Sequence, residues 1–357
     1  MSRVVRLAYR DPLELIWRQC AAALGFRLAE SPEVYASSDG RGGIVLGCAA
    51  TLDADDTLAQ MVLHELCHAL VQGEAGAGQP DWGLDNTSER DVWREHACLR
   101  LQAWLTQAWG LREFFAPTTD FRLSFWPLLP AHPLSPIPSL DAEADEQARV
   151  AARVAILRAS EPPWSTALQT ALAGTRALAD AVLSVPSASA AATLWATVSP
   201  RPALHPAGHA SVAVDAALQC ADCAWAYTLR GRLHCRHAPA KALPPDSPAC
   251  LRHEPASALD CRPCAACCRE AFDSVEVGPR ERTVKRHPEL ITEHHGRLAL
   301  RRAAGLCEAL SVSTNTHAAA GPCYTCRIYA DRPRNCRDFT QASGNCLLAR
   351  RRVGLSL

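Results

Sequence analysis

The first 110 residues alternate between helix-like and strand-like patterns of apolar positions. Residues 11–24 carry apolar side chains at helical spacing, which predicts an amphipathic helix. Short strands are predicted at Gly25–Ala29, Val34–Ala36 and Gly43–Gly47, because Ser-Pro and Asp-Gly turn signals separate them.

Two longer helical patterns follow these strands. The first runs from Thr57 to Gln72, with candidate N-caps in residues 53–56 and a stop at Gly73. The second runs from about Ser88 to Trp109 after a glycine-rich loop. The order helix, strands, helix, loop, helix is typical of an α+β fold.

The rest of the chain is divided by changes in composition. A proline-rich stretch from Trp126 to Leu140 predicts an extended connector, and residues 142–159 and 164–183 predict two helices that pack on the first domain. An Ala/Ser/Pro-rich segment then gives way to cysteine, arginine and histidine. We therefore expect five parts, at residues 1–125, 126–183, 184–219, 220–256 and 257–357.

Charge and cysteine usage narrow the class of protein. Lys plus Arg equals Asp plus Glu, at 37 each, which gives no indication of a nucleic-acid or membrane partner. Of the 17 cysteines, 13 lie between Cys220 and Cys346. The start lacks a basic and then apolar signal segment, and no stretch approaches a membrane span. We therefore expect a cytoplasmic protein whose closely spaced cysteines bind metal rather than form disulfides.

The helix predicted at Thr57–Gln72 contains His64-Glu65-x-x-His68. Residues four apart share one helix face, so both imidazoles are expected to point toward a common ion, with Glu65 placed to contact the water on that ion. A catalytic zinc needs a third protein ligand and an open position. The alternative is an ordinary buried helix that contains two histidines. Helical periodicity does not choose among the candidate third ligands, which are Glu89, Asp91, Glu95 and His96.

The stretch MVLHELCHALVQG, followed 27 residues after His68 by Glu95, resembles compact gluzincin peptidases. The resemblance implies a zincin-like domain in which His64, His68 and Glu95 bind zinc and Glu65 acts as the catalytic base. It also implies a peptide or protein substrate, aligned on GGIVLG as the edge strand.

The first cysteine module has four thiols whose spacing is typical of a closed tetrahedral zinc site with a structural role. Three flanking histidines, His234, His237 and His253, are alternative ligands, whereas His205 and His209 are interpreted as incidental. The predicted ligands are Cys220, Cys223, Cys235 and Cys250.

The second module opens with CxxCxxCC and continues with CRIYADRPRNCRDF. These residues resemble the zinc/iron-chelating cysteine-cluster family (the YkgJ type), with Ala265 in place of the usual glycine and Cys323 as an extra cysteine. The resemblance implies either two mononuclear sites or one cluster, and thiolate ligands favour zinc or iron, including iron–sulfur. The implied ligands are Cys261, Cys264, Cys267, Cys268, Cys307, Cys326, Cys336 and Cys346.

Two functions of different classes follow from these patterns. The favoured hypothesis is a zinc-dependent, peptidase-like hydrolase joined to a metal-chelating cysteine domain. The alternative is a non-enzymatic metal-handling or metal- or redox-sensing protein with a structural or vestigial His-Glu-x-x-His site. Nucleic-acid binding is disfavoured, because the net charge is zero and the cysteine-rich region has few aromatic residues.

Overall fold

A computed structural model of the chain describes residues 7–48, 50–85, 88–184, 193–211, 218–269, 271–313 and 323–357. It divides into two compact units, the first formed by Met1–Leu140 and Ala144–Ala203 and the second by Asp141–Glu143 and Leu204–Leu357. The parts predicted at residues 1–125 and 126–183 belong to this first unit, apart from Asp141–Glu143. Parts of the expected linker, residues 185–192 and 212–217, lie outside the described residues.

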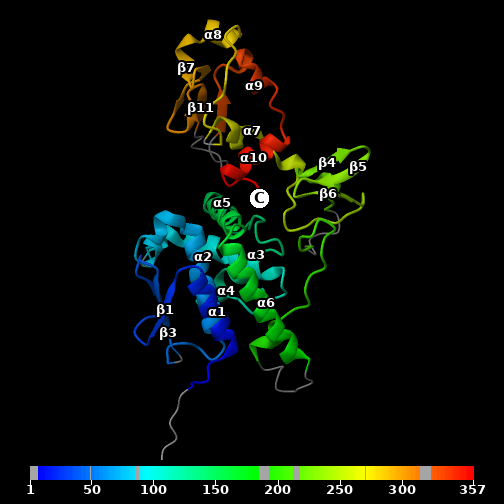
Figure 1. Cartoon of the computed structure of the whole chain (residues 1–357). Coiled ribbons are helices and arrows are strands. Elements are labelled where there is room, and N and C mark those ends of the chain that lie inside the picture. The colour runs from blue at the N-terminus through cyan, green and yellow to red at the C-terminus, as the bar shows by residue number, and fades with distance from the viewer. Residues whose placement is uncertain are drawn as a thin grey trace, which may run out of the picture. The chain divides into compact units, whose positions relative to one another are not determined.

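The first unit combines helices with a small sheet, as an α+β class predicts (Figure 1). The predicted helices at residues 11–24, 142–159 and 164–183 are confirmed to within a residue at each end. The strands are β1 Arg27–Ser31, β2 Ala36–Ser38 and β3 Gly43–Gly47. The helices are α1 Pro12–Ala23, α2 Leu58–Ala77, α3 Val92–Gln107, α4 Phe121–Ser124, α5 Ala142–Ala159 and α6 Trp164–Leu183.

The sheet has the strand order β1-β3-β2, with β1 parallel and β2 antiparallel to β3. The expectation that Gly43–Gly47 is an edge strand is therefore wrong, since β3 is central and β2 is the edge nearer to the site described below. A local apolar pattern identifies a strand but not its neighbours, which depend on how the chain returns.

Helices α1, α2, α3 and α6 lie side by side in the first unit (Figure 1). Trp17 of α1 is fully buried, stacks edge-on against Phe115 at 5.2 Å, and donates a hydrogen bond from its indole N–H to Thr175 of α6 at 3.0 Å. The buried indole is thus satisfied, and it fixes α6 against α1.

Helix α2 begins with a capping box rather than at the acidic residues 53–56. The Thr57 hydroxyl accepts from the Gln60 backbone N–H, and the Gln60 side chain accepts from the Thr57 N–H. Gly73 interrupts the helix at φ 62°, where the sequence predicts its end, and one further turn follows to Ala77. Arg158 of α5 donates to the carbonyl of Leu70 at 2.6 Å and so caps the regular part of α2.

The proline-rich stretch 126–140 is not an extended connector, because it folds onto α3. Trp126, Leu129 and Ile137 are buried in a cluster with Leu99 and Ala103. Proline has no N–H, so this segment has few donors for its own carbonyls, and arginines supply donors to several of them.

The second unit contains short strands and turns around its cysteines. An antiparallel three-stranded sheet, in the order β4-β5-β6, precedes a series of hairpins. The strands are β4 Ala226–Leu229, β5 Arg232–Cys235, β6 Ala238–Leu243, β7 Ile291–His294, β8 Arg297–Leu300, β9 Arg302–Ala303, β10 Leu306–Cys307, β11 Leu310–Ser313 and β12 Cys323–Cys326. The helices are α7 Cys261–Cys264, α8 Arg282–Arg286, α9 Arg334–Arg337 and α10 Gly344–Arg352.

In the described residues, each helix is too short or too polar to cross a bilayer.

Candidate metal sites

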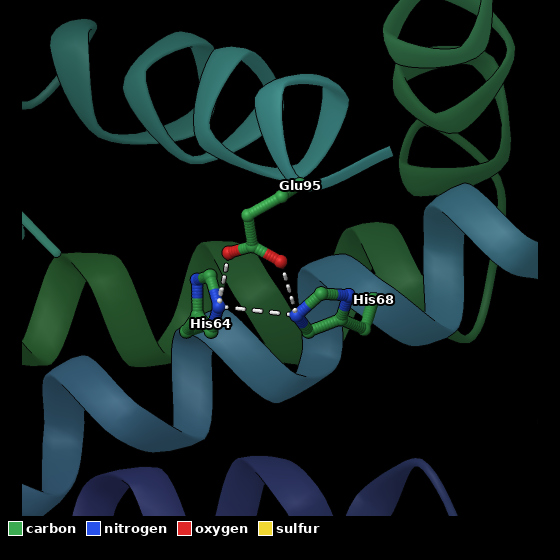
Figure 2. Close-up of side chains that lie close together, drawn as sticks. All are labelled: His64, His68 and Glu95. Atoms are coloured by element: carbon green, nitrogen blue, oxygen red, sulfur yellow. Dashed lines mark hydrogen bonds and ion pairs between the residues drawn. The ribbon is translucent and has the colours of Figure 1, made fainter. Parts of the chain in front are cut away.

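His64 and His68 on α2 face Glu95 on α3 (Figure 2). Glu95 Oε1 lies 2.9 Å from His64 Nε2, Glu95 Oε2 lies 3.3 Å from His68 Nε2, and the two Nε2 atoms are 3.1 Å apart. Ligands about 2.0–2.1 Å from a tetrahedral zinc are themselves roughly 3.3–3.4 Å apart. The three side chains therefore fit the ligand set of one small divalent cation.

Both imidazoles are held in the orientation that a metal ligand needs. His64 Nδ1 lies 3.1 Å from the Gln102 side-chain oxygen, and His68 Nδ1 lies 3.1 Å from the Cys98 sulfur. A ligating imidazole donates its other ring N–H to an acceptor, and the Gln102 oxygen, which can only accept, fixes the His64 tautomer that leaves Nε2 for an ion. The Cys98 sulfur can accept from His68 in the same way. Cys98 and Gln102 share one face of α3 with Glu95, at spacings of three and seven residues.

His96, the neighbouring candidate, points elsewhere. Its ring stacks on Phe125, with centroids 3.8 Å apart and planes 6° apart. Burial and the nearby Arg100 charge lower the pKa of His96 to about 4, so it is neutral at physiological pH. Of these two adjacent candidates, only Glu95 reaches the histidine pair.

The three groups form a largely buried charged cluster. Burial opposes the charge on His64, but the Glu95 carboxylate raises its pKa to about 9. Burial also opposes the charge on Glu95, but His68 and His64 lower its pKa to about 2. Burial lowers the pKa of His68. The site thus stabilises positive charge at the point where the nitrogens and the carboxylate meet.

Glu65 is buried beside the histidines, and its Oε2 accepts a hydrogen bond from the indole N–H of Trp82 at 2.7 Å. Trp82 has φ 59°, an uncommon conformation for a residue with a side chain. The preceding residue, Asp81, accepts a hydrogen bond from the Ser38 N–H of β2 at 3.0 Å. The turn thus fixes the Glu65 carboxylate relative to the edge strand.

A cavity of about 340 Å³ opens onto this site. His64, Glu65 and Glu95 line one part of it, and Tyr35 and Ala36 line another, where β2 begins. This volume lies at the small end of the range for ligand sites. The cavity can therefore admit a small molecule or part of a peptide.

The four cysteines of the first module gather around a cavity of about 10 Å³ in the second unit. Cys220, Cys223, Cys235 and Cys250 all line it, as do His237 and His253. His234 is not among the lining residues, and its Nδ1 lies 3.2 Å from the Pro239 carbonyl.

His205 belongs to this site and is not incidental. It is 2% exposed, and its Nε2 lies 3.1 Å from the Cys220 sulfur. Its Nδ1 accepts the Ala207 backbone N–H at 2.9 Å, so in the neutral ring the proton sits on Nε2 and is donated to sulfur. Such a hydrogen bond stabilises a thiolate.

Six of the eight cysteines of the second module fall in two packing clusters. Cys264 and Cys267 belong to one, and Cys268, Cys307, Cys326 and Cys336 to the other. The sulfurs of Cys267 and Cys268 are 3.9 Å apart. Ala265 has φ 42°, so the turn that favours glycine is kept with alanine in it.

The His-His-Glu site and the cysteine sites differ in how close together their ligand atoms lie. Among the described residues, His64, His68 and Glu95 form the group of three whose ligand atoms all lie within 4.8 Å of one another. The cysteine sulfurs are nearby in each cluster but are not drawn together to that extent in the described part of the chain.

Sequence reasoning missed Cys98, Gln102, Trp82 and His205. The sequence could have indicated Cys98 and Gln102, since they follow Glu95 at helical spacing. Trp82 is a large apolar residue in a loop of small and polar ones, which is a weaker signal. His205 is separated from Cys220 by 15 positions and had none.

Comparison of the chain with protein-family models, curated proteins and solved structures finds no match. Both resemblances stated above therefore remain predictions.

Proposed function

We propose that the first unit is a zincin-like, metal-dependent hydrolase that cleaves peptide bonds, and that the second unit binds zinc or iron through its cysteines. The observation that supports the hydrolase most strongly is the convergence of His64, His68 and Glu95 beside Glu65, at the wall of a cavity.

A zinc ion on these three ligands would lower the pKa of a bound water and polarise a substrate carbonyl. The chain supplies the proton transfers. Oε2 of Glu65 accepts from Trp82, so its other oxygen accepts the proton of the attacking water and then passes it to the leaving amine.

Strand β2 is the proposed guide for the substrate. As the edge of the sheet it has no strand on its outer side, where the Ser38 N–H donates to Asp81, and its first residue, Ala36, lines the cavity. An extended peptide can add to such an edge through main-chain hydrogen bonds. This arrangement favours a peptide over a compact, charged substrate.

The test is Glu65→Gln in the full chain, assayed with a fluorescence-quenched peptide library. We expect cleavage to fall by about 10²–10⁴-fold, the usual contribution of a general base, with zinc content unchanged. Glu89→Gln is the matched control, because it also replaces a glutamate by glutamine, but on an exposed turn near the cavity. Equal cleavage by wild type and Glu65→Gln would rule out this site as the source of hydrolysis.

A second candidate, a non-enzymatic metal-handling protein, is supported by the thirteen cysteines of the second unit. It predicts that the wild type binds zinc in the first unit but cleaves no peptide in the library. The same experiment therefore separates the two functions.

A further inference from the structure

The cysteine-rich part of the second unit leaves open which sulfurs share an ion. The packing of the cysteine side chains, however, divides most of them into two groups. Cys264 is buried in a small cluster with Ala266, Ala271 and Ala349, and Cys267 lies against this cluster.

A different cluster surrounds Cys307. It is formed by aliphatic residues such as Leu290, Leu300 and Ile328, and Cys268, Cys326 and Cys336 pack against it. Four cysteines from four separate segments thus lie in or against one apolar cluster.

The division falls between two adjacent residues. Cys267 and Cys268 lie in the 3₁₀ turn η8 Ala266–Cys268, where successive side chains diverge by roughly 120° because there are three residues per turn. The left-handed turn at Ala265 starts η8 directly after α7. The two sulfurs are nevertheless only 3.9 Å apart, so the two clusters meet at this pair, with Cys267 packed against one and Cys268 against the other.

Cys261 and Cys346 join the Cys264 side. Cys261 begins α7, which ends at Cys264, and Cys346 lies on α10, which packs against η8. Burial raises the pKa of Cys261, and negative charge on Cys267, Cys346 and Cys264 would raise it further, as expected for neighbouring thiols.

We propose that these eight cysteines form two separate four-thiolate metal sites. Cys261, Cys264, Cys267 and Cys346 hold one ion, and Cys268, Cys307, Cys326 and Cys336 hold the other. This division rests on the proposed metal binding by the second unit, and it goes further by assigning every ligand.

The local charge suits two such sites. A zinc ion with four thiolates carries a net charge of about −2. Between Arg262 and Arg352 there are 16 Lys and Arg residues against 9 Asp and Glu, an excess of 16 − 9 = 7 positive charges. Arginines also lie at both sites, since Arg350 hydrogen bonds Cys264, and Arg327 and Arg332 are close to Cys326.

Cys323 is the competitor for this assignment. It begins β12, and β12 packs against α7, which carries Cys261 and Cys264. Like Cys261 and Cys346, it belongs to neither packing cluster. Unlike Cys346, however, it is not among the neighbouring thiols that chiefly raise the pKa of Cys261, and it pairs with Ser313 of β11. We therefore assign it no ion.

The test is cadmium-113 NMR of the full chain produced with ¹¹³Cd. Correlations between cysteine β-protons and cadmium identify the ligands of each ion without any substitution. We expect Cys267 and Cys268 to correlate with different cadmium resonances, each shared with the three partners assigned above, and Cys323 with neither.

Failure of the division and failure of metal binding give different results. If Cys267 and Cys268 share a resonance, if either couples to two, or if Cys323 couples to one, cadmium is bound but the division is wrong. If none of the nine cysteines from Cys261 to Cys346 couples to cadmium, metal binding by this region is wrong as well.

Substitutions give an independent check by metal counting. Cys336→Ser and Cys346→Ser should each lose one ion, and the double variant should lose two. Cys323→Ser, the control, should lose none. A double variant that loses no more than either single variant would indicate one shared cluster and overturn the proposal.

Discussion

Gln102 offers a sharp test of whether the first unit is built to hold a metal. Its side chain is fully buried, with Oε1 3.1 Å from His64 Nδ1 and Nε2 donating to the Phe115 carbonyl at 2.5 Å. Gln102→Met keeps the length of the side chain but removes the acceptor for the His64 N–H. The imidazole then loses the contact that fixes its tautomer and orientation.

Loss of such a contact typically weakens metal binding 10–100-fold, which is about 1.4–2.7 kcal/mol. The assay is zinc competition with a chromophoric chelator, and the His64→Ala/His68→Ala double variant gives the background from the cysteine sites. Gln102→Glu keeps an acceptor for His64 but not the donor to Phe115, so its zinc affinity should stay near that of the wild type.

Gln107→Met is the matched control. Gln107 lies on the same helix and also donates to a backbone carbonyl, that of Ala131 at 2.7 Å, but is not in contact with His64. Unchanged zinc affinity in Gln102→Met, or an equal loss in Gln107→Met, would refute the idea that Gln102 orients a ligand.

Three further outcomes follow from the structure. Asp145→Ala should lower the free energy of unfolding by about 3–5 kcal/mol in a urea titration, because it leaves the fully buried Arg100 without its carboxylate partner. Ala265→Gly should raise the free energy of unfolding of the second unit by up to about 1 kcal/mol, because glycine adopts the left-handed conformation at φ 42° without strain. Chelator-treated protein should lose stability as the pH rises from 6.5 to about 9, because the pKa of His64 is raised in the folded state and the stabilising proton is lost over that window. Zinc-loaded protein should not show this loss in the first unit, since ligating imidazoles are already deprotonated.

Helices α2, α5 and α6 could be predicted because each has a regular periodicity and a clear stop or start. The face of α3 that carries Glu95, Cys98 and Gln102 could not be predicted. Residues 97–104 of α3 are all buried, so no apolar stripe marks one face as the inner one. Only the packing of α3 on α2 decides that Glu95, Cys98 and Gln102 face the histidines while His96 faces Phe125.

The proline-rich stretch shows a different limit of sequence reasoning. Prolines limit regular structure there to the short 3₁₀ helix η3 at Trp126–Leu128, but they do not exclude burial, provided that the carbonyls find donors. Arg112 donates to the carbonyls of Pro130 and Leu129, at 2.9 and 2.8 Å, and Arg100 donates to that of Ser135 at 3.0 Å. These donors come from other segments, so composition alone cannot reveal them.

His205 shows how a metal module can extend beyond its spaced cysteines. Pro206 and Gly208 exclude a helix, and for that reason the sequence indicates no shared face with His209. The same residues instead form a tight turn, in which Gly208, at φ 84°, donates to the His205 carbonyl at 2.7 Å and His205 donates to the His209 carbonyl at 2.8 Å. The turn packs the imidazole of His205 against Cys220, so the environment of that sulfur depends on residues before the expected module boundary at 220. Ligand spacing can thus identify the sulfurs of such a site, but the groups that tune them follow from the path of the chain.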